Sequence, residues 1–70
     1  MSNLIDILSG YCKVIKINRN VSYWAGLGII KGIELEIIKN DSVGVIVGIR
    51  GRLGYRLALG RGICGEIEVL

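Results

Sequence analysis

Glycine recurs along the whole of this 70-residue chain, eleven times in all, and no proline occurs. Between the glycines lie short stretches rich in β-branched and other aliphatic residues. Because glycine is disfavoured inside helices and tolerated at tight turns, this spacing indicates short strands joined by turns. A chain this short buries only about 60% of its unfolded surface and is too short to form two separate cores. We therefore expect one domain over residues 1–70. The hydrophobic content of 51% is what such a domain needs for its core.

The clearest strand pattern is the segment in which Ile33, Leu35 and Ile37 alternate with Glu34 and Glu36. A period of two places the aliphatic side chains on one face and the glutamates on the other. The same reasoning predicts strands over residues 11–17, 45–49, 55–59 and 66–70. Alternation is imperfect in the first of them, and a β-bulge there would explain it.

One short helix is predicted over residues 20–28, after the first strand. Tyr23, Trp24 and Leu27 recur at helical spacing, Asn20 stands at the N-cap, and Gly28 suits a left-handed helix end. Residues 4–8 fit one helical turn, and residues 60–65 fit a loop or a tight helical turn. Short strands must close on themselves to hide their edges. The expected fold is therefore all-β, a small five-stranded SH3-like β-barrel with one short helix after the first strand.

The sequence lacks the combinations of residues that usually perform catalysis. There is no histidine, and hence no ordinary imidazole base. The glycines form neither a phosphate-binding loop nor a GxGxxG fingerprint. Cys12 and Cys64 are far apart with no CxxC, so we expect buried, reduced thiols, leaving open a disulfide or a metal shared between chains. We predict a protein that is not an enzyme, with no catalytic residue, cofactor or metal site.

Charge and hydropathy bear on location and partners. The longest apolar run falls well short of the ~18 residues of a membrane span, and no basic segment typical of a signal peptide precedes Asp6. We expect a cytoplasmic protein that does not span the membrane, with peripheral association at its inner face left open.

The net charge is +3, and Arg50, Arg52, Arg56 and Arg61 form a cluster without an acid. Such a cluster suits phosphate, an acidic protein surface, or a solvated outer face.

Two segments, WAGLGIIKGIELEII at residues 24–38 and GYRLALGRGICGEIEV at residues 54–69, resemble the ferrous-iron transport protein A (FeoA) family. The resemblance covers nearly the whole chain. The matching positions are a helix end and turn, a Gly-x-x-apolar-Ala-Leu segment and a final Ile-x-Val: Leu27, Gly28, Ile29, Gly32, Gly54, Leu57, Ala58, Leu59, Ile67 and Val69.

This resemblance implies an SH3-like barrel that acts in bacterial ferrous-iron transport and iron homeostasis. It implies a cytosolic accessory protein for the ferrous-iron permease (FeoB), which carries a GTP-binding domain. Transition-metal binding is a term used for the family, but the resemblance does not imply that this protein carries iron itself. The same barrel also occurs at the C-terminus of metal-dependent repressors, so a regulatory role is a close variant.

A candidate partner-binding surface follows from the residue types that most often anchor interfaces, aromatic residues and arginine. For Trp24 and Leu27 the alternative is that they plug the end of the barrel. The candidates, on the helix and in the arginine-rich segment, are Tyr23, Trp24, Leu27, Arg50, Arg52, Tyr55 and Arg56.

Two alternatives to the permease hypothesis stay open from the sequence. A small basic barrel can bind RNA or another nucleic acid, and the pI near 9.1 favours this, whereas the few aromatic residues disfavour it. Self-association into a homo-oligomer is the other, because a short apolar chain can leave a hydrophobic patch exposed. Val21, Ile38 and Ile46 are the candidates for that patch.

Overall fold

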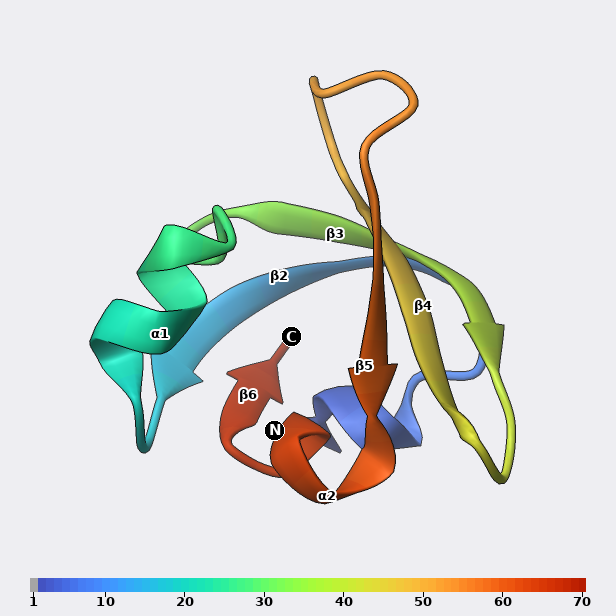
Figure 1. The fold of residues 1–70 in the computed structure, drawn as a ribbon, viewed down its shortest axis with the longest axis horizontal. Coiled ribbons are helices and arrows are strands. Elements are labelled where there is room, and N and C mark those ends of the chain that lie inside the picture. Colours follow the sequence, from blue (N-terminus) through green and yellow to red (C-terminus); the bar gives the residue numbers. More distant parts are fainter. Residues whose placement is uncertain (1) are drawn as a thin grey trace.

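The computed structural model describes residues 2–70, and Figure 1 shows their arrangement. Strands dominate, and three short helical segments join them. In chain order the elements are β1 (Ser2–Asn3), the 3₁₀ helix η1 (Leu4–Asp6), β2 (Gly10–Ile17), α1 (Val21–Gly26), β3 (Glu34–Asn40), β4 (Gly44–Ile49), β5 (Arg56–Gly60), α2 (Arg61–Cys64) and β6 (Ile67–Val69).

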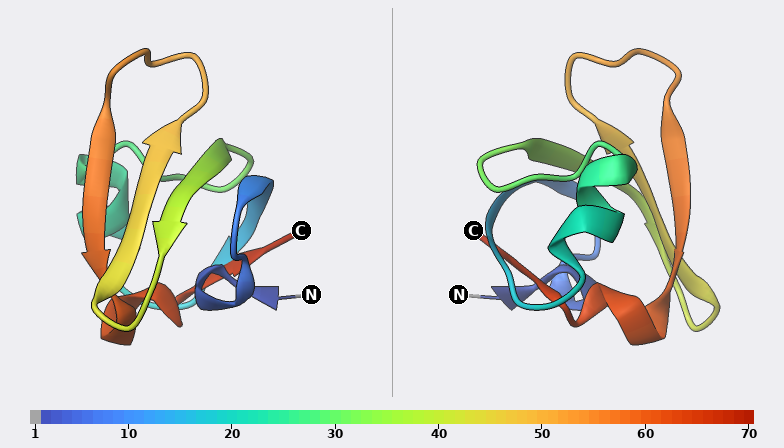
Figure 2. Two further views of the ribbon diagram at one scale, coloured as in Figure 1. Left: turned by 90° about the vertical axis from the view of Figure 1, so that its right-hand side faces the viewer. Right: turned by 60° about the vertical axis from the view of Figure 1, so that its left-hand side comes forward.

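All strands belong to one antiparallel sheet with the order β1-β6-β2-β3-β4-β5. Figures 1 and 2 show β2 and β3 arching over the interior, so that the sheet curls into a small barrel-like body. This mostly-β architecture agrees with the expected SH3-like barrel. Two strands end the sheet: β1, only two residues long, and β5, which α2 connects onward to β6.

The expected numbers of strands and helices were wrong. The sheet has six strands, because Ser2 pairs with Val69 and Asn3 with Glu68 to form β1. Serine and asparagine carry no strand signal of their own, so this strand exists only through its tertiary pairing. The α-helices number two, since residues 61–64 close into α2, and the predicted helix α1 follows the second strand.

Within the sheet the predicted alternation is confirmed. Leu35 and Ile37 are buried while Glu36 is exposed, and Val45 and Val47 point into the core with them. The register of β2 against β6 shifts between Val14 and Lys16, which is the irregularity expected in this strand.

Both cysteines are unpaired and buried in the core. Burial raises the pKa of the Cys12 thiol and of the Cys64 thiol above the usual value, which favours the neutral form. The two side chains therefore act as small hydrophobic residues in this structure.

Helix α1 places Trp24 inside the barrel. The Trp24 side chain is fully buried, and its Nε1 donates a hydrogen bond to Glu66 Oε1 at 3.0 Å. Asn20 stands before the helix, as expected, but does not cap it; its Nδ2 also donates to Glu66 Oε1, at 3.1 Å. Gly28 follows the helix at φ +92°, as the helix-end prediction required. Glu66 thus ties α1 to the start of β6.

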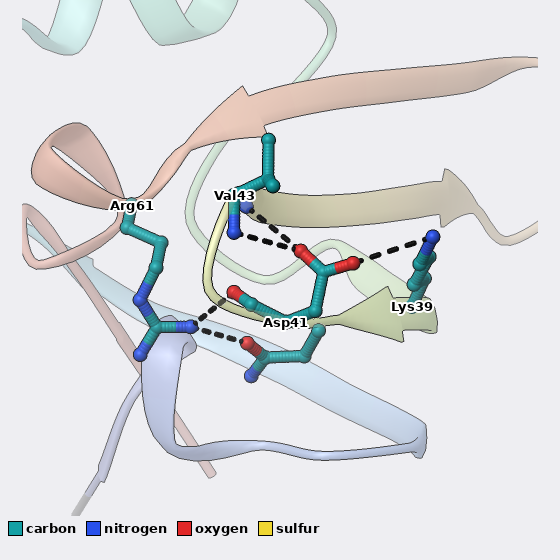
Figure 3. Close-up of polar contacts among 6 residues, drawn as sticks. Lys39, Asp41, Val43 and Arg61 are labelled. Atoms are coloured by element: carbon teal, nitrogen blue, oxygen red, sulfur yellow. Dashed lines mark hydrogen bonds and ion pairs between the residues drawn. The ribbon is translucent and has the colours of Figure 1, made fainter.

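The turn between β3 and β4 is closed by Asp41. Its Oδ1 accepts hydrogen bonds from the backbone N–H of Val43 at 2.9 Å and of Gly44 at 3.2 Å, and its Oδ2 lies 3.3 Å from Lys39 Nζ (Figure 3). These donors lower the pKa of the Asp41 carboxyl, with the two backbone N–H groups as the main causes.

Arg61 takes part in the fold and does not join the other arginines. Its Nη1 donates to the backbone oxygen of Asp41 and to Oδ1 of Asn40, both at 2.7 Å (Figure 3). Asn40 Nδ2 in turn donates to the carbonyls of Ile5 at 2.8 Å and Ile7 at 2.9 Å. These contacts join α2, the β3–β4 turn and the segment around η1.

Gly44 provides a test of the β4–β5 pairing. A Cβ atom at Gly44 would overlap the carbonyl oxygen of Leu59, a backbone atom that cannot move aside. We expect Gly44→Ala to lower the free energy of unfolding by about 1–3 kcal/mol in urea titrations. The control is Gly62→Ala, in α2, where nothing lies within 4 Å of the added Cβ and alanine favours the helix. Equal stability of the two variants would contradict this packing.

Glu66 provides a pH test of the Trp24 site. Hydrogen bonds from Asn20 and Trp24 hold the pKa of Glu66 below its ordinary value of 4.5. A carboxyl group whose pKa is lowered by folding stabilises the folded state at pH values above its ordinary pKa. This stabilisation is lost as the pH falls through the folded-state pKa. We expect Glu66→Gln, which keeps an acceptor oxygen, to flatten the loss of stability from about pH 5 toward pH 2.

The control for Glu66→Gln is Glu36→Gln, which makes the same charge change on the exposed face of β3. Thermal or urea unfolding across the acid range measures both variants against the wild type. The same pH profile for the two variants would show that the bonds to Glu66 do not carry the effect.

Candidate functional site

The β4–β5 connection, residues 50–55, projects beyond the sheet in Figure 1 and in both views of Figure 2. Together with the outer face of β2, β3 and β4 it encloses an open groove of about 320 Å³. We name this feature the arginine groove and define it by Tyr11, Glu36, Gly48, Arg52, Tyr55 and Arg56, all of which line it.

The floor of the arginine groove is one row of residues across four strands. Tyr11 in β2 lies opposite Glu36 in β3, Glu36 opposite Gly48 in β4, and Gly48 opposite Arg56 in β5. Gly48 leaves the middle of this row without a side chain. A Cβ built there would lie 3.5 Å from Ile38 Cδ1 and 3.6 Å from the Tyr55 carbonyl oxygen, so the gap is roughly methyl-sized.

Arginines on tyrosine rings form the walls. The guanidinium carbon of Arg52 lies 4.2 Å from the centroid of the Tyr55 ring, and that of Arg50 lies 5.6 Å from the centroid of Tyr11. Both distances fall within the range of cation–π attraction. Arg50 Nη1 also lies 2.6 Å from Glu34 Oε2, and this bond raises the pKa of Arg50. Arg50 is thus neutralised locally, whereas Arg52 has no ion pair within residues 2–70.

The loop is fixed to the end of α1. Tyr55 donates its hydroxyl hydrogen bond to the backbone oxygen of Leu27 at 2.8 Å. A Cβ at Gly28 would lie 2.9 Å from Arg52 Nη1 and 3.1 Å from Ile49 Cδ1. Arg52 therefore packs across Gly28, where a larger residue would displace it. Gly28 therefore has two roles: it adopts the left-handed conformation at the helix end, and it leaves the space in which Arg52 lies.

Four of the seven candidate partner-binding residues come together in or beside the arginine groove: Arg50, Arg52, Tyr55 and Arg56. Arg56 is exposed at the start of the edge strand β5, and Arg50 leans on Tyr11. Contact of these residues with a partner stays a prediction.

The helix candidates do not join them on one surface. Trp24 is fully buried, which corrects its assignment to a binding surface and agrees with the alternative that it plugs the barrel. Tyr23 is 56% exposed and stands edge-on to Trp24, with ring centroids 5.6 Å apart. The Leu27 side chain is half-buried, and its contribution to the groove is its backbone carbonyl.

Tyr11, Glu36, Ile38 and Gly48 were missed as groove residues by sequence reasoning. Glu36 had been assigned to the solvated face of its strand, which is correct, but that face is also the floor of the groove. Alternation identifies the face on which a side chain lies and not its neighbours on adjacent strands. Only the strand register brings these residues into one row.

Within residues 2–70 no three His, Cys, Asp or Glu side chains are grouped so that they could hold a metal ion. The same part of the chain contains no helix that is long and apolar enough to cross a membrane.

Gly28 and Gly32 form a matched pair for testing the anchoring of Arg52. Their φ angles are +92° and +94°, so alanine at either position costs about 1–2 kcal/mol in left-handed strain. Only the Gly28 Cβ meets other atoms; the Gly32 Cβ has none within 4 Å. We expect Gly28→Ala to be less stable than Gly32→Ala and to shift the Arg52 Nε–Hε NMR signal. An unmoved Arg52 signal in Gly28→Ala would contradict the contact.

Two solved structures share this fold. A crystal structure of an iron uptake regulatory protein (FeoA) superposes with a TM-score of 0.81 at 22% identity, covering 96% of this chain and 90% of that chain. The NMR structure of a FeoA-like protein from Clostridium acetobutylicum superposes with a TM-score of 0.76 at 22% identity, covering 100% of this chain and 88% of that chain. No curated protein matches the sequence.

The sequence itself matches the family model described as the FeoA domain over residues 9–70, nearly the whole chain. This match includes both segments that carry the resemblance, residues 24–38 and 54–69, and it implies involvement in ferrous-iron uptake. The chain belongs to the FeoA domain family.

Proposed function

We propose that this protein is a cytosolic accessory protein of bacterial ferrous-iron uptake that binds the FeoB-type permease through the arginine groove. Membership in the FeoA domain family supports a role in ferrous-iron uptake, and the arginine groove is the observation that supports binding to a protein partner. Arginine and tyrosine are the residues that most often anchor protein interfaces. Here they are gathered on one outer face, on a loop that Tyr55 and Gly28 fix in place.

The chemistry of the groove supports binding over catalysis. Its polar side chains are guanidinium groups, tyrosine hydroxyls and the Glu36 carboxylate. None of them forms a pair of nucleophile and base, which covalent catalysis requires. Guanidinium groups stay protonated and repel cations, so the groove is also a poor site for Fe²⁺, which prefers imidazole and carboxylate ligands. A role in iron uptake is therefore best served by contact with the transport machinery.

Titration of the isotope-labelled protein with the purified cytosolic domain of the permease tests this function. We expect amide NMR shifts at Gly48, Arg52 and Arg56, recorded with and without guanine nucleotide. The control variant is Tyr23→Ala on α1, which should bind like the wild type because Tyr23 lies outside the groove. Absence of shifts anywhere in the protein at millimolar partner would sink the proposal for this domain of the permease.

A further inference from the structure

We propose that the arginine groove receives an acidic peptide segment of its protein partner. In this arrangement a carboxylate binds Arg52 and Arg56, and a neighbouring aliphatic side chain covers the floor at Gly48. The inference rests on the proposed function only in taking the partner to be a protein. It adds the chemistry by which that partner is recognised.

Charge complementarity supports an acidic occupant. Of the three arginines at the groove, Arg50 is already bound to Glu34 at 2.6 Å, whereas Arg52 and Arg56 form no ion pair within residues 2–70. Arginine recognises carboxylates through two parallel hydrogen bonds, which fixes the orientation of the acid. With Arg50 paired to Glu34, the two positive charges of Arg52 and Arg56 exceed the one negative charge of Glu36 among the residues that line the groove.

Arg52 is held ready for such a ligand. Tyr55 supports its guanidinium at 4.2 Å, and Gly28 leaves the space in which its Nη1 lies. Ordering a free arginine on binding costs side-chain entropy, and a guanidinium already supported by a ring loses less of it. The loop thus presents a positioned donor and not a flexible one.

The floor of the groove is suited to an aliphatic side chain. Gly48 has no side chain, Ile38 Cδ1 borders the gap, and Ile49 lines the same groove. At the rim, Leu53 is fully exposed and is therefore available to cover an incoming apolar group. A segment with a carboxylate next to an aliphatic residue matches both halves of the site.

Nucleic acid matches the same site less well. Single strands bind basic barrels by stacking bases on aromatic faces. An arginine lies over the ring of each tyrosine in the groove, Arg52 over Tyr55 and Arg50 over Tyr11, where it competes with a stacking base. These contacts disfavour the RNA-binding alternative.

A peptide titration tests the inference independently of the permease. The probe is a dodecapeptide with one leucine between two pairs of glutamates in a Gly-Ser background, followed by NMR in about 50 mM salt. We expect shifts at Gly48, Arg52 and Arg56 that fade as salt rises. Replacing the probe's glutamates by glutamine should weaken binding about tenfold, and replacing its leucine by serine about threefold.

Variants of the protein locate the effect. Arg56→Gln should weaken probe binding about tenfold, because an exposed charge that contacts the carboxylate is lost. The matched control Arg19→Gln removes an exposed arginine outside the groove and should leave the groove shifts unchanged. Equal weakening of probe binding in both variants, or equal binding of the glutamate and glutamine probes, would overturn the inference.

The outcomes also separate this inference from the proposed function. If the probe binds the groove but the permease domain gives no shifts, the acidic-peptide site stands and the proposed partner is wrong. If the permease domain shifts only residues outside the groove, the accessory role at the permease stands, but binding through the groove is overturned. Tighter binding of a deoxythymidine dodecamer at the groove would overturn it in favour of nucleic acid.

Discussion

Burial of the Trp24 indole is the interaction on which the rest of the structure depends. The ring fills the interior of the curled sheet, and its N–H would be left without a partner there if Glu66 did not accept it at 3.0 Å. This bond joins α1 to the residue that precedes β6. With the helix fixed, its C-terminal end at Leu27 and Gly28 becomes a rigid surface on which the β4–β5 loop can rest.

The same residue type has two different roles in this barrel, and its hydrogen-bond partners decide which. Arg61 is satisfied by Asn40 and a backbone carbonyl, so its charge is used to join elements of the fold. Arg52 rests on Tyr55 with its Nη1 against Gly28, and its side chain forms no ion pair within residues 2–70. The four arginines that are clustered in the sequence are therefore one structural arginine, Arg61, and three groove arginines, Arg50, Arg52 and Arg56.

The limits of sequence reasoning follow from what periodicity can encode. The alternation around Leu35 and Ile37 predicts their burial correctly, because the face of a strand is a local property. Pairing partners are not local, so the row from Tyr11 to Arg56 and the two-residue β1 could not be predicted. Helical spacing left Trp24 as a candidate both for a binding surface and for the plug of the barrel, and its full burial agrees with the plug.

Gly48 bears most directly on whether the outer face of the sheet has a function. It is not among the glycines at positive φ, so its backbone does not require glycine. Its surroundings do not require it either, since a Cβ would meet only ordinary contacts at 3.5 to 3.9 Å. Glycine within a strand costs about 0.5–1 kcal/mol relative to alanine. Neither strain nor crowding therefore accounts for glycine at this position, and its missing side chain leaves room for one methyl group at the floor of the arginine groove.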